Sequence, residues 1–198
     1  MPLHRRSFLA APLLSAPWLA LPHAQAATPN DALRALKAGG AVLAFRHALA
    51  PGTFDPPGFK LGDCSTQRNL SEEGRTQARR IGAWLAAQGL KPARVRSSPW
   101  CRCIDTATLA FGQAEAWPAL GSPAGSPEQT NAAHLAQLRQ ALRDAAAQPQ
   151  ALQVWVTHMF VLAALTQENS ASGEGLVLKL PAGGGPSDRV QVLARLVL

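Results

Sequence analysis

The alternation of short apolar runs with longer helix-like segments constrains the fold of this chain more than any other feature. The runs that predict strands span residues 41–45, 93–97, 114–117, 151–157, 176–180 and 190–197. The segments that predict helices span residues 31–37, 72–88, 99–111, 128–147 and 160–166. Alternating strands and helices are typical of a layered α/β domain. We therefore expect a three-layer α/β/α sandwich with a mostly parallel central sheet.

The first 26 residues have the features of an export signal. A basic start with Arg5 and Arg6 precedes an apolar stretch, and the A-x-A sequence at 24–26 matches a signal cleavage site. The apolar stretch is short for a bilayer span, and its prolines disfavour an anchor helix. Paired arginines before Phe8 and Leu9 are similar to a twin-arginine signal, although general secretory signals also contain such pairs. We predict a cleavable signal at 1–26, a single mature domain at 27–198 without membrane insertion, and a periplasmic or secreted bacterial protein.

The charge of the chain is modestly positive. The formal net charge is +7, and removal of Arg5 and Arg6 with a signal that holds no acidic residue leaves +5. Such a charge suits an anionic partner. The basic residues are scattered and are not interleaved with aromatic residues, which disfavours nucleic-acid binding. We expect a small anionic substrate instead, and the sequence leaves the oligomeric state open.

Polar side chains stand at the ends of three predicted strands. Arg46 and His47 follow the first strand, Ser97 ends the second, and His158 follows the fourth. The carboxyl ends of parallel strands meet at one edge of a sheet, where ligands bind. Each residue alone is ordinary, but together they indicate an anion site, because arginine offers paired donors to oxyanions.

A neutral imidazole at such a site can attack phosphorus and carry the phosphoryl group covalently. Fixed arginine donors would stabilise the charge of the phosphoryl group in transfer. The sequence lacks the H-x-x-x-H spacing, paired aspartates and the P-loop. We therefore expect neither a metal nor an organic cofactor.

Four ordered motifs resemble the histidine phosphatase superfamily, whose members share the phosphoglycerate mutase-like fold. The motifs are FRH at 45–47, NLSEEG at 69–74, SSPWCRCIDTA at 97–107 and VTH at 156–158, within a resemblance that covers about residues 40–180. It implies that His47 accepts the phosphoryl group, that Arg46 and Arg102 grip it, and that His158 contacts its oxygens. We expect His158 to work best in its protonated form, as a donor to those oxygens. Arg68 and Ser97 are candidates for substrate binding.

The chain departs from this family in ways that affect the expected chemistry. Ala48 stands where relatives have glycine, which could alter the loop because alanine disfavours positive φ. Met159 follows His158, and no glutamate occurs at 120–122, so the usual general acids are missing. The candidates for this role are Glu174 and then Glu128. Without an acid, the enzyme would need a good leaving group, such as phosphohistidine or an acyl phosphate.

Three cysteines offer a disulfide. In an exported protein such a bridge is plausible. Cys101 and Cys103 lie on one predicted helix and point about 200° apart, so only one of them can meet Cys64. Three buried free thiols and a C-x-C redox site are the alternatives.

Together these features predict a metal-independent phosphomonoester phosphatase that works through a phosphohistidine at His47. One alternative is a phosphatase for lipopolysaccharide or another envelope phosphate, as export would allow. The other is a non-catalytic domain of the same fold that binds phosphate or a phosphosugar, as the missing acid would allow.

Overall fold

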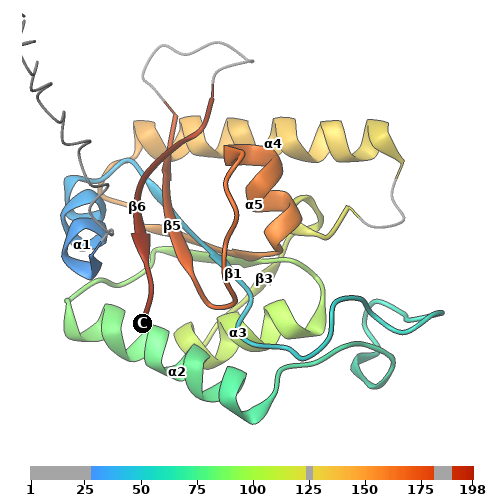
Figure 1. Ribbon diagram of the computed structural model, residues 1–198. Helices are drawn as coiled ribbons and strands as arrows, with labels where there is room; N and C mark the ends of the chain where they lie inside the picture. The colour runs from blue at the N-terminus through green and yellow to red at the C-terminus, as the bar shows by residue number, and fades with distance from the viewer. Residues whose placement is uncertain (1–27, 124–126, 181–188) are drawn as a thin grey trace, which may run out of the picture.

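A computed structural model describes residues 28–123, 127–180 and 189–198 (Figure 1). The predicted signal at 1–26 lies outside these ranges. The described residues form one sheet with the strand order β3-β2-β4-β1-β5-β6. Its strands are β1 (Val42–Arg46), β2 (Arg94–Ser97), β3 (Glu115–Ala116), β4 (Gln153–Thr157), β5 (Gly175–Lys179) and β6 (Gln191–Leu196). Strands β1 to β4 pair in parallel, whereas β5 and β6 pair antiparallel.

Helices cover both faces of this sheet. One face carries α1 (Pro29–Ala38), α2 (Glu72–Ala87) and α3 (Cys101–Phe111). The other carries α4 (Glu128–Ala147), α5 (Met159–Thr166) and the 3-10 helix η2 (Pro118–Leu120). Figure 1 shows α2 and α3 below the sheet and α4 and α5 above it. The predicted α/β/α sandwich is confirmed. Within the described ranges, no helix has the length and hydropathy that a bilayer span requires.

The central strands are apolar because both of their faces are covered. Residues 42–45 of β1 are fully buried, with Leu43 and Phe45 packed toward α1, α2 and α3. Val42 and Ala44 belong to the core on the opposite face, against α4 and α5. A strand buried on both sides loses polar alternation. The continuous apolar run therefore predicted a central strand correctly.

Two helix starts differ from the sequence-based expectation. Helix α1 begins at Pro29 after Thr28, whose N–H donates to Oδ2 of Asp31 over 2.9 Å. Proline suits this first position because its missing N–H would be unpaired there. Helix α3 begins at Cys101 rather than Pro99, and the Cys101 N–H donates to the side-chain oxygen of Gln67 over 3.0 Å. That acceptor comes from a distant loop, so the local sequence does not reveal it.

Helix α2 lies close to the chain that leaves β1. Ser71 caps it, since its Oγ accepts from the N–H of Gly74 over 3.1 Å. A Cβ on Gly74 would lie 2.0 Å from the carbonyl oxygen of Leu49. Likewise, a Cβ on Gly82 would lie 1.9 Å from the carbonyl oxygen of Ala110 in α3. These two glycines allow α2 to pack against the site-bearing loop and α3.

Candidate active site

Three strand ends meet at one edge of the sheet. The His47 N–H donates to the carbonyl oxygen of Thr157 at the end of β4, over 2.9 Å. The Ser98 N–H donates to the carbonyl oxygen of Val156, over 2.8 Å. The rings of His47 and His158 consequently lie with their centroids 5.6 Å apart. The structure thus places the polar groups that follow β1, β2 and β4 beside one another.

A cavity of about 330 Å³ opens at this edge. Its walls come from the loop after β1, the first turn of α3 and the start of α5. Five of the residues singled out from the sequence line it: Arg46, His47, Arg68, Arg102 and His158. A concave site with convergent cationic groups is suited to an anionic small molecule.

His47 presents one free ring nitrogen at the cavity. Its side chain is buried, and its Nδ1 lies 2.8 Å from the carbonyl oxygen of Ala48. A carbonyl only accepts hydrogen bonds, so Nδ1 carries the proton and Nε2 holds the lone pair. Burial and, to a smaller extent, the charges of Arg102, Arg68 and Arg46 lower the pKa of His47 to about 3, although the hydrogen bond to Ala48 opposes this shift. The His47 ring is therefore neutral at ordinary pH.

His158 is also neutral in this arrangement. Its Nδ1 lies 3.4 Å from Nη2 of Arg102, which only donates, and its Nε2 lies 2.8 Å from Oγ of Ser98. Nε2 of His158 therefore carries the proton and donates a hydrogen bond to Oγ of Ser98. Burial, followed by the charge of Arg102, lowers the pKa of His158 well below its usual range. In the free protein this lowered pKa disfavours the protonated form of His158 that we expect to donate to a bound phosphoryl group.

Three arginines surround the cavity with unused donors. Arg46 donates from Nη1 to the carbonyl oxygen of Ser170 over 2.9 Å, and Arg68 donates to that of Ala50. The Nε atoms of Arg46, Arg68 and Arg102 are buried and have no acceptor within the protein. Burial and then the neighbouring Arg102 charge lower the pKa of both Arg46 and Arg68. The three guanidinium groups line one cavity, so their combined positive charge favours a bound anion.

Asp55 is a cavity residue that the sequence analysis missed. Its Oδ1 accepts from Nη1 of Arg102 over 2.8 Å and from the Arg68 N–H over 3.0 Å. Its Oδ2 accepts from Nε1 of Trp100 over 3.1 Å. The available signal was a lone carboxylate within a Gly- and Pro-rich loop after β1. With both histidines neutral, three guanidinium groups and one carboxylate leave two positive charges, which match a phosphate dianion.

Three predicted site residues do not line the cavity. Ser97 is fully buried and donates its hydroxyl to the carbonyl oxygen of Ser98 over 2.9 Å. Glu174 lies before β5, where Nη1 of Arg195 is 2.6 Å from its Oε1. Glu128 begins α4 and lines a separate cavity. The structure therefore supports none of them in substrate binding or acid catalysis, and neighbouring Ser98 is the serine that contacts His158.

Ala48 fits its position without strain. Its methyl group is fully buried, in a small cluster with Ala50, Leu70 and Ala78. Among the described residues, Gln167 is the only non-glycine with a positive φ, so Ala48 adopts an ordinary backbone conformation. The missing glycine therefore does not distort the loop.

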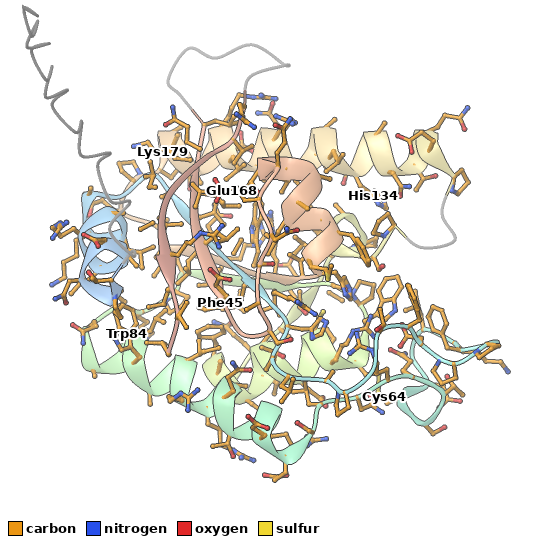
Figure 2. The ribbon with its side chains drawn as sticks, viewed as in Figure 1. Phe45, Cys64, Trp84, His134, Glu168 and Lys179 are labelled. Atoms are coloured by element: carbon orange, nitrogen blue, oxygen red, sulfur yellow. A yellow bond between two sulfur atoms is a disulfide. The ribbon has the colours of Figure 1, made fainter. Side chains whose placement is uncertain are left out.

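The loop after β1 is covalently attached to α3. Cys64 and Cys101 form a disulfide, and Cys103 is buried and free. Figure 2 labels Cys64 on this loop. The prediction that Cys64 pairs with one of the two helix cysteines is confirmed. Because Cys101 pairs with Cys64, the C-x-C redox alternative is wrong. Burial raises the pKa of the free Cys103 thiol to about 12.

Metal ligands do not cluster in the part of the chain that the structure describes. No group of three or more His, Cys, Asp or Glu side chains there is arranged to hold an ion. The charged groups of the cavity are instead mainly arginines, which bind oxyanions directly.

Part of the chain matches the model of a known family. The model of the histidine phosphatase superfamily, branch 1, matches residues 62–120, which include α2, β2 and α3. The fold brings the motifs at 45–47 and 156–158 to one edge of the sheet. The matched region contributes Arg102 to the same edge. This part of the chain is therefore similar to the histidine phosphatase superfamily, as the motifs predict.

Solved structures of this superfamily share the fold. The protein histidine phosphatase SixA, complexed with tungstate, is 20% identical over 79% of this chain and 96% of its own, with a TM-score of 0.51. A mycobacterial glucosyl-3-phosphoglycerate phosphatase is 17% identical over 78% of this chain and 97% of its own, with a TM-score of 0.56. No curated protein sequence matches this chain. At these identities the structural similarity concerns the fold.

Proposed function

We propose that this protein is a phosphatase that hydrolyses small phosphomonoesters through a covalent phosphohistidine at His47. The observation that carries the proposal is the free Nε2 of a buried, neutral imidazole in a cavity that three arginines also line. A nucleophile adjacent to fixed oxyanion donors is the arrangement that phosphoryl transfer requires. The solved relatives support it, since their names describe phosphatases of a protein histidine and of a phosphosugar acid.

The first step transfers the phosphoryl group to the protein. The Nε2 lone pair of His47 forms a bond to phosphorus, and the ester P–O bond breaks with its electron pair on the leaving oxygen. Arg46, Arg68 and Arg102 donate to the phosphoryl oxygens and offset their charge. His158 lies beside these arginines, because its Nδ1 contacts Nη2 of Arg102.

The second step regenerates His47. A water molecule attacks phosphorus, the N–P bond breaks, and its electron pair returns to Nε2. Inorganic phosphate leaves, and the water's proton passes to the phosphate or to solvent. The arginines act in both steps, because both transition states place similar charge on the phosphoryl oxygens. The guanidinium groups of the three arginines supply the positive charge that both steps require.

Among the described residues of the cavity, no carboxylic acid is free to protonate the leaving oxygen. Among the residues that the structure describes, Asp55 is the only carboxylate that lines the cavity; its Oδ1 accepts a hydrogen bond from Arg102 and its Oδ2 one from Trp100. A leaving group must then depart with its electron pair and take a proton from solvent. The lack of a free acid is also the basis for the alternative function. In that case the same site would bind phosphate or a phosphosugar without turnover.

The direct test is to trap the intermediate. The purified protein is mixed with ³²P-labelled substrate, quenched in alkali, and mapped for acid-labile, base-stable label on His47. We expect labelled His47 and p-nitrophenyl phosphate turnover in the unaltered protein, and neither in His47→Ala. The control is His134→Ala, because His134 lies on α4 away from the cavity (Figure 2). Phosphate binding without label or turnover would establish the non-catalytic alternative, and strict dependence on added divalent metal would refute the mechanism.

We also propose that the chain is exported and acts outside the cytoplasm as a mature domain of residues 27–198. The Cys64–Cys101 disulfide supports an oxidising compartment. An envelope phosphate such as that of lipopolysaccharide would be an accessible substrate there. We expect secreted protein to begin at Ala27 and the Arg5→Lys, Arg6→Lys double variant to remain in the cytoplasm. Normal export of the double variant would exclude the twin-arginine route.

A further inference from the structure

Four of the nine phenylalanine and tryptophan residues that the structure describes line one cavity. The sequence contains six phenylalanines, five tryptophans and no tyrosine. Phe54, Phe59, Trp100 and Phe160 all line the cavity beside the arginines. Elsewhere the core consists mainly of Ala, Leu and Val. Aromatic side chains so placed provide surface for a ligand as well as for folding.

Two of these rings are exposed at the mouth. Phe54, on the loop after β1, is 73% exposed, and Phe160, in the first turn of α5, is 42% exposed. A phenylalanine that exposes most of its surface contributes little to the core. Their position on two different elements around one opening indicates an apolar entrance to a cationic site.

The aromatic surface continues inward to the catalytic edge. The ring centroids of Phe59 and Trp100 are 6.0 Å apart, and those of Trp100 and His158 are 5.2 Å apart with the rings nearly perpendicular. These are ordinary geometries for interacting rings. A planar group attached to a phosphate at His47 would therefore meet aromatic neighbours along the path to the mouth.

The lack of a free acid at the described residues of the cavity also favours an aromatic leaving group. Phenols have a pKa of about 10, as for tyrosine, whereas water has a pKa of about 15.7 and aliphatic alcohols resemble it. A phenolate can thus leave without protonation far more readily than an alkoxide. Because Asp55 accepts hydrogen bonds from Arg102 and Trp100, the cavity is matched to an oxygen that leaves as an anion.

We infer that the preferred substrates are phosphate monoesters of phenols, of which tyrosine O-phosphate is the ordinary biological case. The inference rests on the proposed phosphatase function and specifies its substrate class. His47 takes the phosphoryl group while the aryl P–O bond breaks, and the phenolate accepts a proton from solvent. Water then releases phosphate from His47. The phenol ring lies against Phe54 and Phe160 in the bound substrate.

The experiment separates ring contact from leaving-group quality. The kcat/KM is measured for phenyl phosphate, tyrosine O-phosphate, cyclohexyl phosphate and acetyl phosphate, the last being a good leaving group without a ring. We expect the two aryl esters to be the best substrates. In Phe54→Ala and Phe160→Ala, kcat/KM for the aryl esters should fall about tenfold, the order of a lost aromatic contact, while that for acetyl phosphate should change less than about twofold.

Leu193→Ala is the matched control, since Leu193 is an exposed apolar residue on β6 that does not line the cavity. Phe54 is exposed, so its replacement leaves the core intact. Acetyl phosphate turnover equal to aryl turnover, with no selective loss in the two phenylalanine variants, would overturn the inference while the phosphatase function stands. No turnover of any ester and no label on His47 would instead overturn the proposed function itself.

Discussion

The carboxylate of Asp55 accepts a hydrogen bond from Nη1 of Arg102 over 2.8 Å, although 47 residues separate the two. Both side chains are almost fully buried. The pair joins the loop after β1 to the first turn of α3 and leaves Nε of Arg102 without a partner in the protein. Asp55 therefore orients the guanidinium for a phosphoryl group, while its own charge opposes that group's binding.

Replacement of Asp55 should separate turnover from phosphate binding. In Asp55→Asn we expect kcat to fall about 10- to 100-fold, the order of a lost charged hydrogen bond, because Arg102 loses its orientation. Inorganic phosphate should inhibit the variant at least as strongly as the unaltered protein, since the cavity gains one net positive charge. Steady-state kinetics with phosphate inhibition provides both values. The control is Asp144→Asn on α4, and unchanged kcat in Asp55→Asn would exclude the positioning role.

The titration of His47 can be observed directly. Burial lowers the pKa of His47 to about 3, and its Nδ1 proton is directed at the Ala48 carbonyl. We expect ¹⁵N NMR to find the Nδ1–H tautomer unchanged between about pH 5 and pH 8, without a titration near the ordinary histidine value. After correction for the substrate's own ionisation, kcat/KM should then show no limb from His47 in this range. A His47 midpoint near neutral pH would contradict the assignment.

The same burial should make the fold less stable in acid. The unfolded His47 takes up a proton near its ordinary pKa of 6.5, whereas the folded residue does so only near about 3. The unfolded state therefore binds more protons between these values, and stability declines as pH falls through 6.5. At pH 5 this amounts to roughly 2 kcal/mol from His47.

Urea unfolding at about pH 7 and about pH 5 measures this difference. His47→Asn has no titratable group there, so the decrease in unfolding free energy between the two pH values should be smaller than in the unaltered protein. His158→Asn should act in the same direction, because the pKa of His158 is lowered by burial as well. An equal decrease in all three proteins would show that other groups control the acid sensitivity.

The disulfide should affect both stability and the site. Cys64 and Cys101 are 37 residues apart, and closing such a loop is worth about 3–4 kcal/mol in the chain-entropy model. We expect the Cys64→Ala, Cys101→Ala double variant to lose about that much unfolding free energy. Its KM should also rise, because the loop that carries Asp55 and Arg68 is no longer attached beside Arg102. Unchanged values for both would refute this role.

Dithiothreitol should reproduce the effect in the unaltered protein and leave the double variant unchanged. Cys103 remains in both proteins and is buried, so it serves as an internal control for thiol chemistry. A loss of activity in the reduced double variant would assign the sensitivity to Cys103 instead.

Local patterns in the sequence determined much of the fold and the first catalytic candidates. The apolar run at 42–45 predicts a central strand because it is buried on both faces. Arg46 and His47 follow that strand directly, so their position at the sheet edge depends on neighbouring residues alone. Ser71 likewise caps α2 through its bond to Gly74, three residues away.

Only the tertiary structure decided which distant groups meet. Asp55 contacts Arg102, Cys64 bonds to Cys101 rather than Cys103, and Glu174 pairs with Arg195 instead of reaching the cavity. The conformation of the loop after β1 depends on how it packs against α2 and α3, and no local periodicity encodes that path. The protonation of His47 was equally hidden, because a pKa is set by burial and by charges brought close in space.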